Sequence, residues 1–96
     1  MSKRKGVKYD KGKPRLGLIP FDALRTVAHV FEFGAKKYGE NNWKGGLEAY
    51  RLHDAALRHM GSLANGERLD KESGLPHAAH AVANMLMLLS LENEKK

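Results

Sequence analysis

The segment that decides the fold of this 96-residue chain is Gly74-Leu75-Pro76-His77-Ala78-Ala79-His80-Ala81-Val82-Ala83-Asn84-Met85-Leu86-Met87-Leu88-Leu89. Ala, Leu and Met favour helices and Pro suits a first turn, so the segment predicts a helix from about Pro76 to Leu91, capped by Ser73 or Leu75. The helix is apolar on nearly every side. It therefore requires burial in a bundle or against another subunit.

Three polar residues interrupt this apolar helix. His77, His80 and Asn84 lie at i, i+3 and i+7, which places them on one stripe of the surface. An unpaired buried polar group costs about 1–3 kcal/mol, so such a stripe needs partners. We interpret it as one wall of a binding site. The alternative is a pair of histidines satisfied by neighbours within a core.

Two further helices precede this one. Pro20 opens a pattern that runs to Tyr38 and stops at Gly39, and a second pattern runs from Leu47 to about Ala64. The sequence therefore predicts an all-α fold, a small bundle of three main helices that oligomerisation completes.

Charged residues follow one face of the second helix. Arg51, Asp54 and Arg58 lie at i, i+3 and i+7, with His59 beside them. The arginines would bind phosphate oxygens, while Asp54 would orient them or hold a metal ion. A helical salt-bridge ladder on the solvent side would show the same pattern.

The connection between the second and third helices is rich in carboxylates. Glu67 and Asp70 are three residues apart, close enough to share a divalent ion if that turn is helical. Oxygen ligands suit magnesium, so Asp54, Glu67 and Asp70 are the predicted Mg²⁺ ligands. The connection also leads to the amino end of the last helix, whose free N–H groups would favour anions. A solvated acidic loop is the alternative.

The connection after the first helix combines cationic and aromatic residues. Lys36 would neutralise phosphates, and Tyr38 or Trp43 would stack on a nucleobase. Trp43 would equally suit a plug over the core.

The net charge of +6 is concentrated at the start of the chain. Residues 1–5 are predicted to be a disordered tail, and residues 6–19 an extended arm with a turn near Asp10-Lys11-Gly12. If the arm lies along the helices, Lys13 and Arg15 would clamp phosphates; otherwise they form a solvated charge run. The rest of the chain is neutral, which makes nucleic acid an unlikely partner.

The sequence predicts one domain over residues 1–96 in a cytoplasmic protein. The sequence has no cysteine and no apolar run long enough to span a bilayer. The basic residues at its start are not followed by the apolar run of a secretory signal. Walker, dinucleotide-binding and zinc-finger spacings are also absent from the sequence.

Several blocks resemble one family, found largely in phages, of dATP/dGTP diphosphohydrolase amino-terminal domains. The blocks are Lys8-Tyr9-Asp10-x-Gly12-Lys13-Pro14-Arg15, Phe33-Gly34-Ala35-Lys36-Lys37-Tyr38, Asn42-Trp43, Asp54-Ala55-Ala56-x-Arg58-His59, Gly66-Glu67-x-x-Asp70-x-Glu72-Ser73-Gly74 and His77-x-x-His80. The resemblance implies an all-α fold and purine deoxynucleotide chemistry akin to the MazG-like pyrophosphohydrolases, which use magnesium. Those enzymes combine a Glu-x-x-Glu helix with a Glu-x-x-Asp helix, and only Glu67-x-x-Asp70 has such a spacing here.

Two functions follow from these residues. The first is a magnesium-dependent phage hydrolase that splits purine deoxynucleoside triphosphates into monophosphate and pyrophosphate, with His77 or His80 positioning or deprotonating water. The second is a phage sponge that binds and sequesters a nucleotide-derived immune signal without cleaving it. In either case Arg51, Arg58, His59 and Asn84 would contact the ligand, and the protein would be a homo-oligomer.

Overall fold

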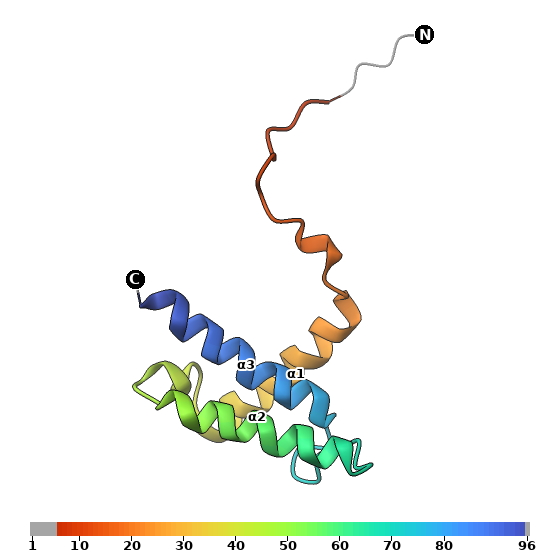
Figure 1. The fold of residues 1–96 in the computed structure, drawn as a ribbon, viewed down its shortest axis with the longest axis vertical. Helices are drawn as coiled ribbons and strands as arrows, with labels where there is room; N and C mark the ends of the chain where they lie inside the picture. The colour runs from red at the N-terminus through yellow and green to blue at the C-terminus, as the bar shows by residue number, and fades with distance from the viewer. Residues whose placement is uncertain (1–5, 96) are drawn as a thin grey trace.

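Helix α3 (His77–Glu94) contacts both of the other long helices, α1 (Phe21–Tyr38) and α2 (Ala49–Ala64). The computed structural model describes residues 6–95, so the disorder predicted for residues 1–5 lies outside the described residues. Figure 1 shows α3 running back over α2, with α1 crossing behind α3. The described chain contains no β-strand, and the predicted all-α bundle of three main helices is confirmed.

The ends of α1 follow directly from its sequence. Pro20 precedes the first helical residue, and Asp22 lies in the first turn, where a carboxylate offsets the helix dipole. At the other end Gly39 has a φ of 96°, which glycine adopts without strain, and its N–H donates to the Ala35 carbonyl at 2.8 Å. The predicted stop at Gly39 is confirmed. Helix α2 begins two residues later than its predicted start at Leu47.

The predicted cap of α3 is wrong. Pro76 occupies the capping position, and no side chain caps the helix. The Ser73 hydroxyl instead accepts the Leu75 N–H at 3.1 Å. The His77 N–H donates to the Arg68 carbonyl at 2.9 Å, so this backbone donor is not free for an anion as the sequence suggested.

The connection between α2 and α3 folds into a tight loop rather than a helical turn. Leu69 and Pro76 form an antiparallel bridge, in which the Asp70 N–H donates to the Leu75 carbonyl at 2.8 Å. Gly74, with a φ of 75°, donates back to the Asp70 carbonyl at 2.8 Å. The helical turn assumed for the Glu67 and Asp70 pair is therefore absent, because this bridge holds Asp70 in an extended segment.

The core is small and consists of short side chains. Val27 and Val30 of α1 pack against Ala79 and Ala83 of α3, with two larger apolar side chains, Phe31 and Leu75, at the edge. The buried residues of α2 are Leu52 and Ala56. The short alanine side chains along α3 leave room for the neighbouring helices to pack against it.

A second face of α3 is apolar and uncovered. Val82, Met85, Leu86 and Leu89 line a shallow groove together with Met60 of α2, and each is between 40% and 53% exposed. The burial on nearly every side that the sequence predicted for this helix is therefore not reached within one chain.

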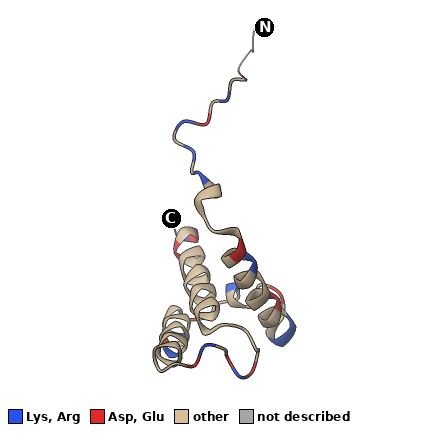
Figure 2. Ribbon diagram, turned by 90° about the vertical axis from the view of Figure 1, so that its right-hand side faces the viewer, with Lys and Arg blue, Asp and Glu red and all other residues tan. Residues whose placement is uncertain are grey.

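The arm does not lie along the helices. Residues 6–20 are all exposed, and Figure 1 shows the arm projecting from the start of α1 away from the bundle. Figure 2 shows basic residues along the arm, to which the exposed Lys13 and Arg15 belong. The turn at Asp10-Lys11-Gly12 is confirmed by the hydrogen bond from the Lys13 N–H to the Asp10 carbonyl at 2.9 Å. None of the described helices is long and apolar enough to cross a membrane.

Candidate functional site

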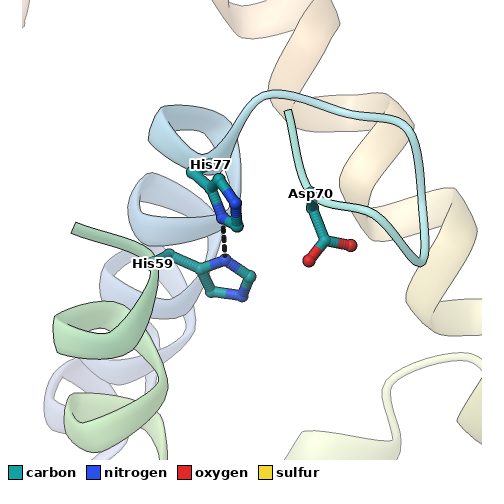
Figure 3. A group of neighbouring side chains, drawn as sticks. All are labelled: His59, Asp70 and His77. Atoms are coloured by element: carbon teal, nitrogen blue, oxygen red, sulfur yellow. Dashed lines mark hydrogen bonds between the residues drawn. The ribbon is translucent and has the colours of Figure 1, made fainter. Parts of the chain in front are cut away.

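Three imidazoles meet where α2 crosses α3. His77 and His80, one turn apart on α3, are only 4% and 8% exposed, and both contact His59 of α2. The Nδ1 atoms of His59 and His77 are 2.8 Å apart, as Figure 3 shows. The rings of His59 and His80 stack with centroids 4.4 Å apart. The i, i+3 spacing on α3 therefore places both histidines against one partner on α2.

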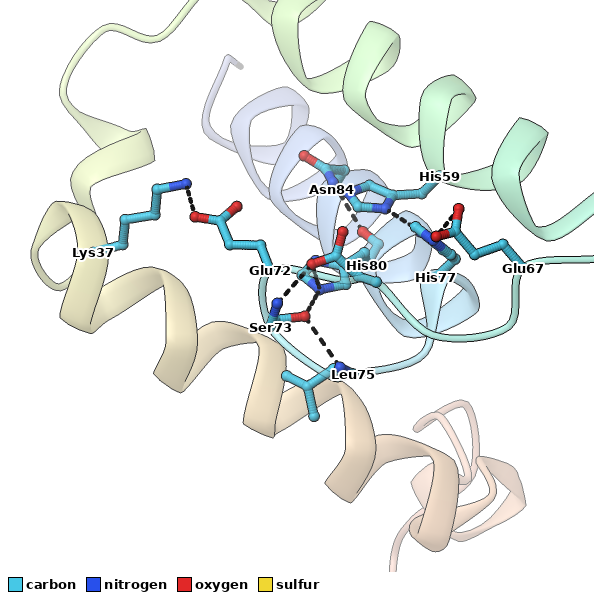
Figure 4. A network of polar contacts seen from close by, with 10 residues as sticks. Lys37, His59, Glu67, Glu72, Ser73, Leu75, His77, His80 and Asn84 are labelled. Carbon is cyan, nitrogen blue, oxygen red and sulfur yellow. Dashed lines mark hydrogen bonds and ion pairs between the residues drawn. The ribbon is translucent and has the colours of Figure 1, made fainter.

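The loop before α3 adds a carboxylate and a hydroxyl to this cluster. The Asp70 Oδ2 atom accepts the Ser73 N–H at 2.8 Å and lies 3.8 Å from the His80 Nε2 atom. The Ser73 hydroxyl forms a 2.7 Å hydrogen bond with the same Nε2 atom (Figure 4). Because the bridge between Leu69 and Pro76 fixes the loop, these groups are held beside the imidazoles.

The Asp70, His80 and Ser73 side chains do not form a nucleophilic triad. A triad needs the carboxylate on one ring nitrogen of the histidine and the hydroxyl on the other, so that a proton moves from serine to a correctly oriented ring. Here both Ser73 and Asp70 face Nε2. The serine therefore orients the ring, and nucleophilic attack through Ser73 is not supported.

Burial and mutual proximity set the protonation of the cluster. Burial lowers the pKa of His59 and His80 below the usual histidine range, and the neighbouring imidazoles lower it further. Burial alone would raise the pKa of Asp70, but the hydrogen bonds from Ser73 and the nearby histidines outweigh it and lower that pKa. The site therefore favours the neutral imidazoles of His59 and His80, able to accept a proton or bind a metal, and the ionised carboxylate of Asp70.

One group of residues could hold a metal ion. His59, Asp70 and His77 each offer a ligand atom, and these atoms all lie within 4.8 Å of one another. In residues 6–95 no other group of three histidine or acidic side chains meets this distance. Asp70 was a predicted metal ligand, whereas its two partners here were predicted to bind substrate or to act in catalysis.

The imidazole cluster opens on a cleft of about 900 Å³. Its walls come from the end of α1, the connection that contains the short 3-10 helix η2 (Asn42–Lys44), α2 and α3. Residues predicted from the sequence that line it are Tyr38, Trp43, Arg51, Arg58, His59, Asp70, His80 and Asn84. Two residues of the α3 stripe, His80 and Asn84, thus share one cavity with the arginines of α2, whereas His77 does not line it.

Asn84, the third member of the stripe, is half-buried in the wall of this cleft. Its amide nitrogen donates to the carbonyl of His80 at 2.9 Å, a contact within α3.

Six predicted residues do not line this cleft, and His77 is one of them. The arm keeps Lys13 and Arg15 away from it, and neither Lys36 nor the exposed Asp54 lines it. The adjacent Lys37 lines the cleft instead and pairs with Glu72, which raises the pKa of the lysine. A helix turns by about 100° per residue, so the sequence alone did not decide which lysine faces inward.

Glu67 also lies outside the cleft, against the back of the imidazole cluster. Its Oε1 atom is 3.4 Å from the Nε2 atom of His77. The three carboxylates predicted to bind magnesium, Asp54, Glu67 and Asp70, are not gathered around one point, and whether magnesium binds remains a prediction.

Comparison with known proteins adds a family to this geometry. No solved structure matches the chain. A dATP/dGTP diphosphohydrolase of Salmonella phage PMBT28 is 41% identical over 90 residues, which cover 94% of this chain but 31% of that relative. The chain therefore spans about a third of that relative's length. The family described as dATP/dGTP diphosphohydrolase, N-terminal, matches residues 3–96. Because that match takes in both the cleft and the imidazole cluster, the chain belongs to this dATP/dGTP diphosphohydrolase amino-terminal family.

Proposed function

We propose that the cleft binds a purine deoxynucleoside triphosphate and hydrolyses it to the monophosphate and pyrophosphate. The observation that carries this proposal is the shared lining of the cleft, in which Arg51 and Arg58 accompany His80 and Asp70. Family membership and the printed name of the phage relative support the substrate class.

The two ends of the nucleotide would contact different walls of the cleft. Arg51 and Arg58 are two helical turns apart, about 10 Å along the axis, so they reach different phosphates of one chain. Tyr38, at the end of α1, and the half-buried Trp43 line the cleft and offer flat apolar faces for a purine ring. A cleft of about 900 Å³ is in the range of pockets that enclose ligands of this size.

The charge of the cleft explains why a divalent cation would accompany the nucleotide. Three cationic side chains, Lys37, Arg51 and Arg58, line it with four carboxylates, Glu32, Glu40, Asp70 and Glu72. A triphosphate would meet a lining with no excess of positive charge. Magnesium bound to the phosphates would offset these carboxylates and neutralise charge on the leaving pyrophosphate.

His80 is the proposed base, because of the two predicted catalytic histidines it alone lines the cleft. Its neutral imidazole would take a proton from water as the water oxygen bonds to the α-phosphorus atom. The bond from that phosphorus to the α,β-bridging oxygen breaks, and pyrophosphate leaves with that oxygen. Ser73 would hold the ring in place through its contact with Nε2.

Sequestration without cleavage is the second candidate function. It is favoured by one observation, that two of the three predicted magnesium ligands, Asp54 and Glu67, do not line the cleft. The cleft would then bind a nucleotide-derived signalling molecule through the same arginines and aromatic rings.

Incubation with dATP or dGTP and magnesium, followed by measurement of pyrophosphate, tests the proposal. We expect turnover, and we expect Arg58→Ala to raise KM about 10- to 100-fold, since a hydrogen bond between charged groups contributes about 1.5–3 kcal/mol. Arg25→Ala, which removes an exposed arginine outside the cleft, is the matched control and should behave as wild type. No pyrophosphate, together with intact nucleotide released on heating, would support sequestration instead.

We also propose that a second copy of the chain covers the apolar groove formed by Met60, Val82, Met85, Leu86 and Leu89. Burying these half-exposed side chains removes apolar area from water at about 25 cal/mol per Å². We expect sedimentation velocity to show a dimer or larger assembly at micromolar concentration. Leu86→Glu should shift it to a monomer, whereas Leu24→Glu, at an exposed leucine outside the groove, should not. A wild-type monomer would contradict the proposal.

A further inference from the structure

The imidazole pair of His59 and His77 has the form of an incomplete coordination site. Their Nδ1 atoms face each other at 2.8 Å, and a hydrogen bond at that distance requires one nitrogen to carry a proton and the other to be bare. Asp70 completes the group within 4.8 Å. We propose that His59, Asp70 and His77 bind a divalent transition-metal ion of the zinc class.

The donor set selects this class of metal. Two imidazole nitrogens and one carboxylate suit zinc, iron, cobalt or nickel, whereas magnesium prefers oxygen ligands. In a tetrahedral site with metal–nitrogen bonds of about 2.0–2.1 Å, ligand atoms lie about 3.3 Å apart. The two Nδ1 atoms are 2.8 Å apart and the ligand atoms of all three residues lie within 4.8 Å of one another, so small side-chain rotations would close the site.

Each ligand has support from a neighbouring group. One oxygen of Asp70, Oδ2, is held by the Ser73 N–H at 2.8 Å. Within residues 6–95 the buried Nε2 atom of His77 has no hydrogen-bond partner, yet it lies 3.4 Å from the Glu67 carboxylate. If His77 binds metal through Nδ1, its proton moves to Nε2 and faces Glu67, a common arrangement behind metal-bound histidines. Glu67 is then a positioning residue rather than a ligand.

The place of the group in the fold gives the ion access to solvent and ligand. His59 and Asp70 line the cleft, whereas His77 lies behind them, so positions left vacant by the three protein ligands would face the cleft. Three protein ligands with open positions are typical of catalytic rather than structural sites. This inference goes beyond the proposed function, because the ion would bind whether or not the chain acts on nucleotides.

The test is metal binding by the nucleotide-free protein. We expect the wild type to bind one Co²⁺ per chain with visible d–d absorption, and Zn²⁺ to displace it in titration calorimetry. Asp70→Asn and His59→Gln should each weaken Zn²⁺ binding at least 10-fold, and Glu67→Gln about 10-fold or more. The double variant His29→Gln, His53→Gln removes two exposed histidines and is the matched control, which should bind as wild type does.

Three results would overturn the proposal. The first is a wild type that does not bind metal stoichiometrically. The second is unchanged Zn²⁺ binding in both His59→Gln and Asp70→Asn, and the third is loss of Zn²⁺ binding in the control variant. Thermal melts followed by circular dichroism identify any variant that fails to fold. If His59→Gln or Asp70→Asn does not fold, Zn²⁺ binding by Glu67→Gln, which changes a half-exposed side chain, still tests the proposal. Metal binding without nucleotide turnover would refute the proposed hydrolase and support the metal site. Nucleotide turnover without metal binding at these residues would refute the metal site and support the hydrolase.

Discussion

Replacing His80 with Gln is expected to lower kcat for dNTP hydrolysis about 100- to 10,000-fold, the usual contribution of a positioned general base. The imidazole is 8% exposed, sits at the wall of the cleft, and is oriented by Ser73 at 2.7 Å. Glutamine keeps a polar group of similar reach but cannot accept the proton. Stopped-time assays of pyrophosphate release give kcat and KM separately.

Nucleotide affinity separates a catalytic from a structural role of His80. If His80 is the base, the affinity of the His80→Gln variant in titration calorimetry should stay within a few-fold of wild type, since Arg51 and Arg58 are untouched. His29→Gln, at an exposed histidine that contacts Glu32 on α1, is the matched control and should retain full activity. If affinity and the melting temperature of His80→Gln fall together with kcat, the histidine supports the fold and is not the base.

Among the variants proposed for this chain, Ala83→Leu should show the largest decrease in the free energy of unfolding. Ala83 is 1% exposed and packs against Val27 and Val30, so three added carbon atoms would crowd the contact between α1 and α3. Overpacking of this kind costs about 1–3 kcal/mol. In a domain of this size each kcal/mol lowers the melting temperature by about 4–8 °C.

Thermal unfolding followed by circular dichroism measures this loss. Ala78→Leu is the matched control, because Ala78 lies on the same helix but is exposed. It should leave the melting temperature within about 4 °C of wild type, since surface changes usually stay within about 0.5 kcal/mol. Equal losses in both variants would mean that the α1–α3 contact does not limit stability.

Much of the fold could be predicted because the signals are local. Prolines before α1 and α3 and a glycine after α1 mark helix ends through backbone geometry alone, and the observed bounds differ from the predicted ones by a few residues at most. The prediction that polar residues of α3 and arginines of α2 share a cavity also followed from helical spacing. It required only that the two helices pack together.

The parts that could not be predicted depend on contacts between elements distant in sequence. The spacing of Glu67 and Asp70 suggested a shared ion, but the bridge between Leu69 and Pro76 directs one toward His77 and the other toward His80. The meeting of His59 with His77 likewise has no signature in spacing, since they lie on different helices. Lys37 lines the cleft and Lys36 does not, because of the rotation of α1 about its axis.

The position of α3 between its two neighbours also bears on how the chain acquires its structure during synthesis. The main contacts of α1 and of α2 are with α3 rather than with each other. Neither helix therefore has a packing surface until the residues from His77 onward have left the ribosome. Packing of α1 and α2 therefore waits for α3, and their apolar stripes would be available to chaperones until α3 emerges.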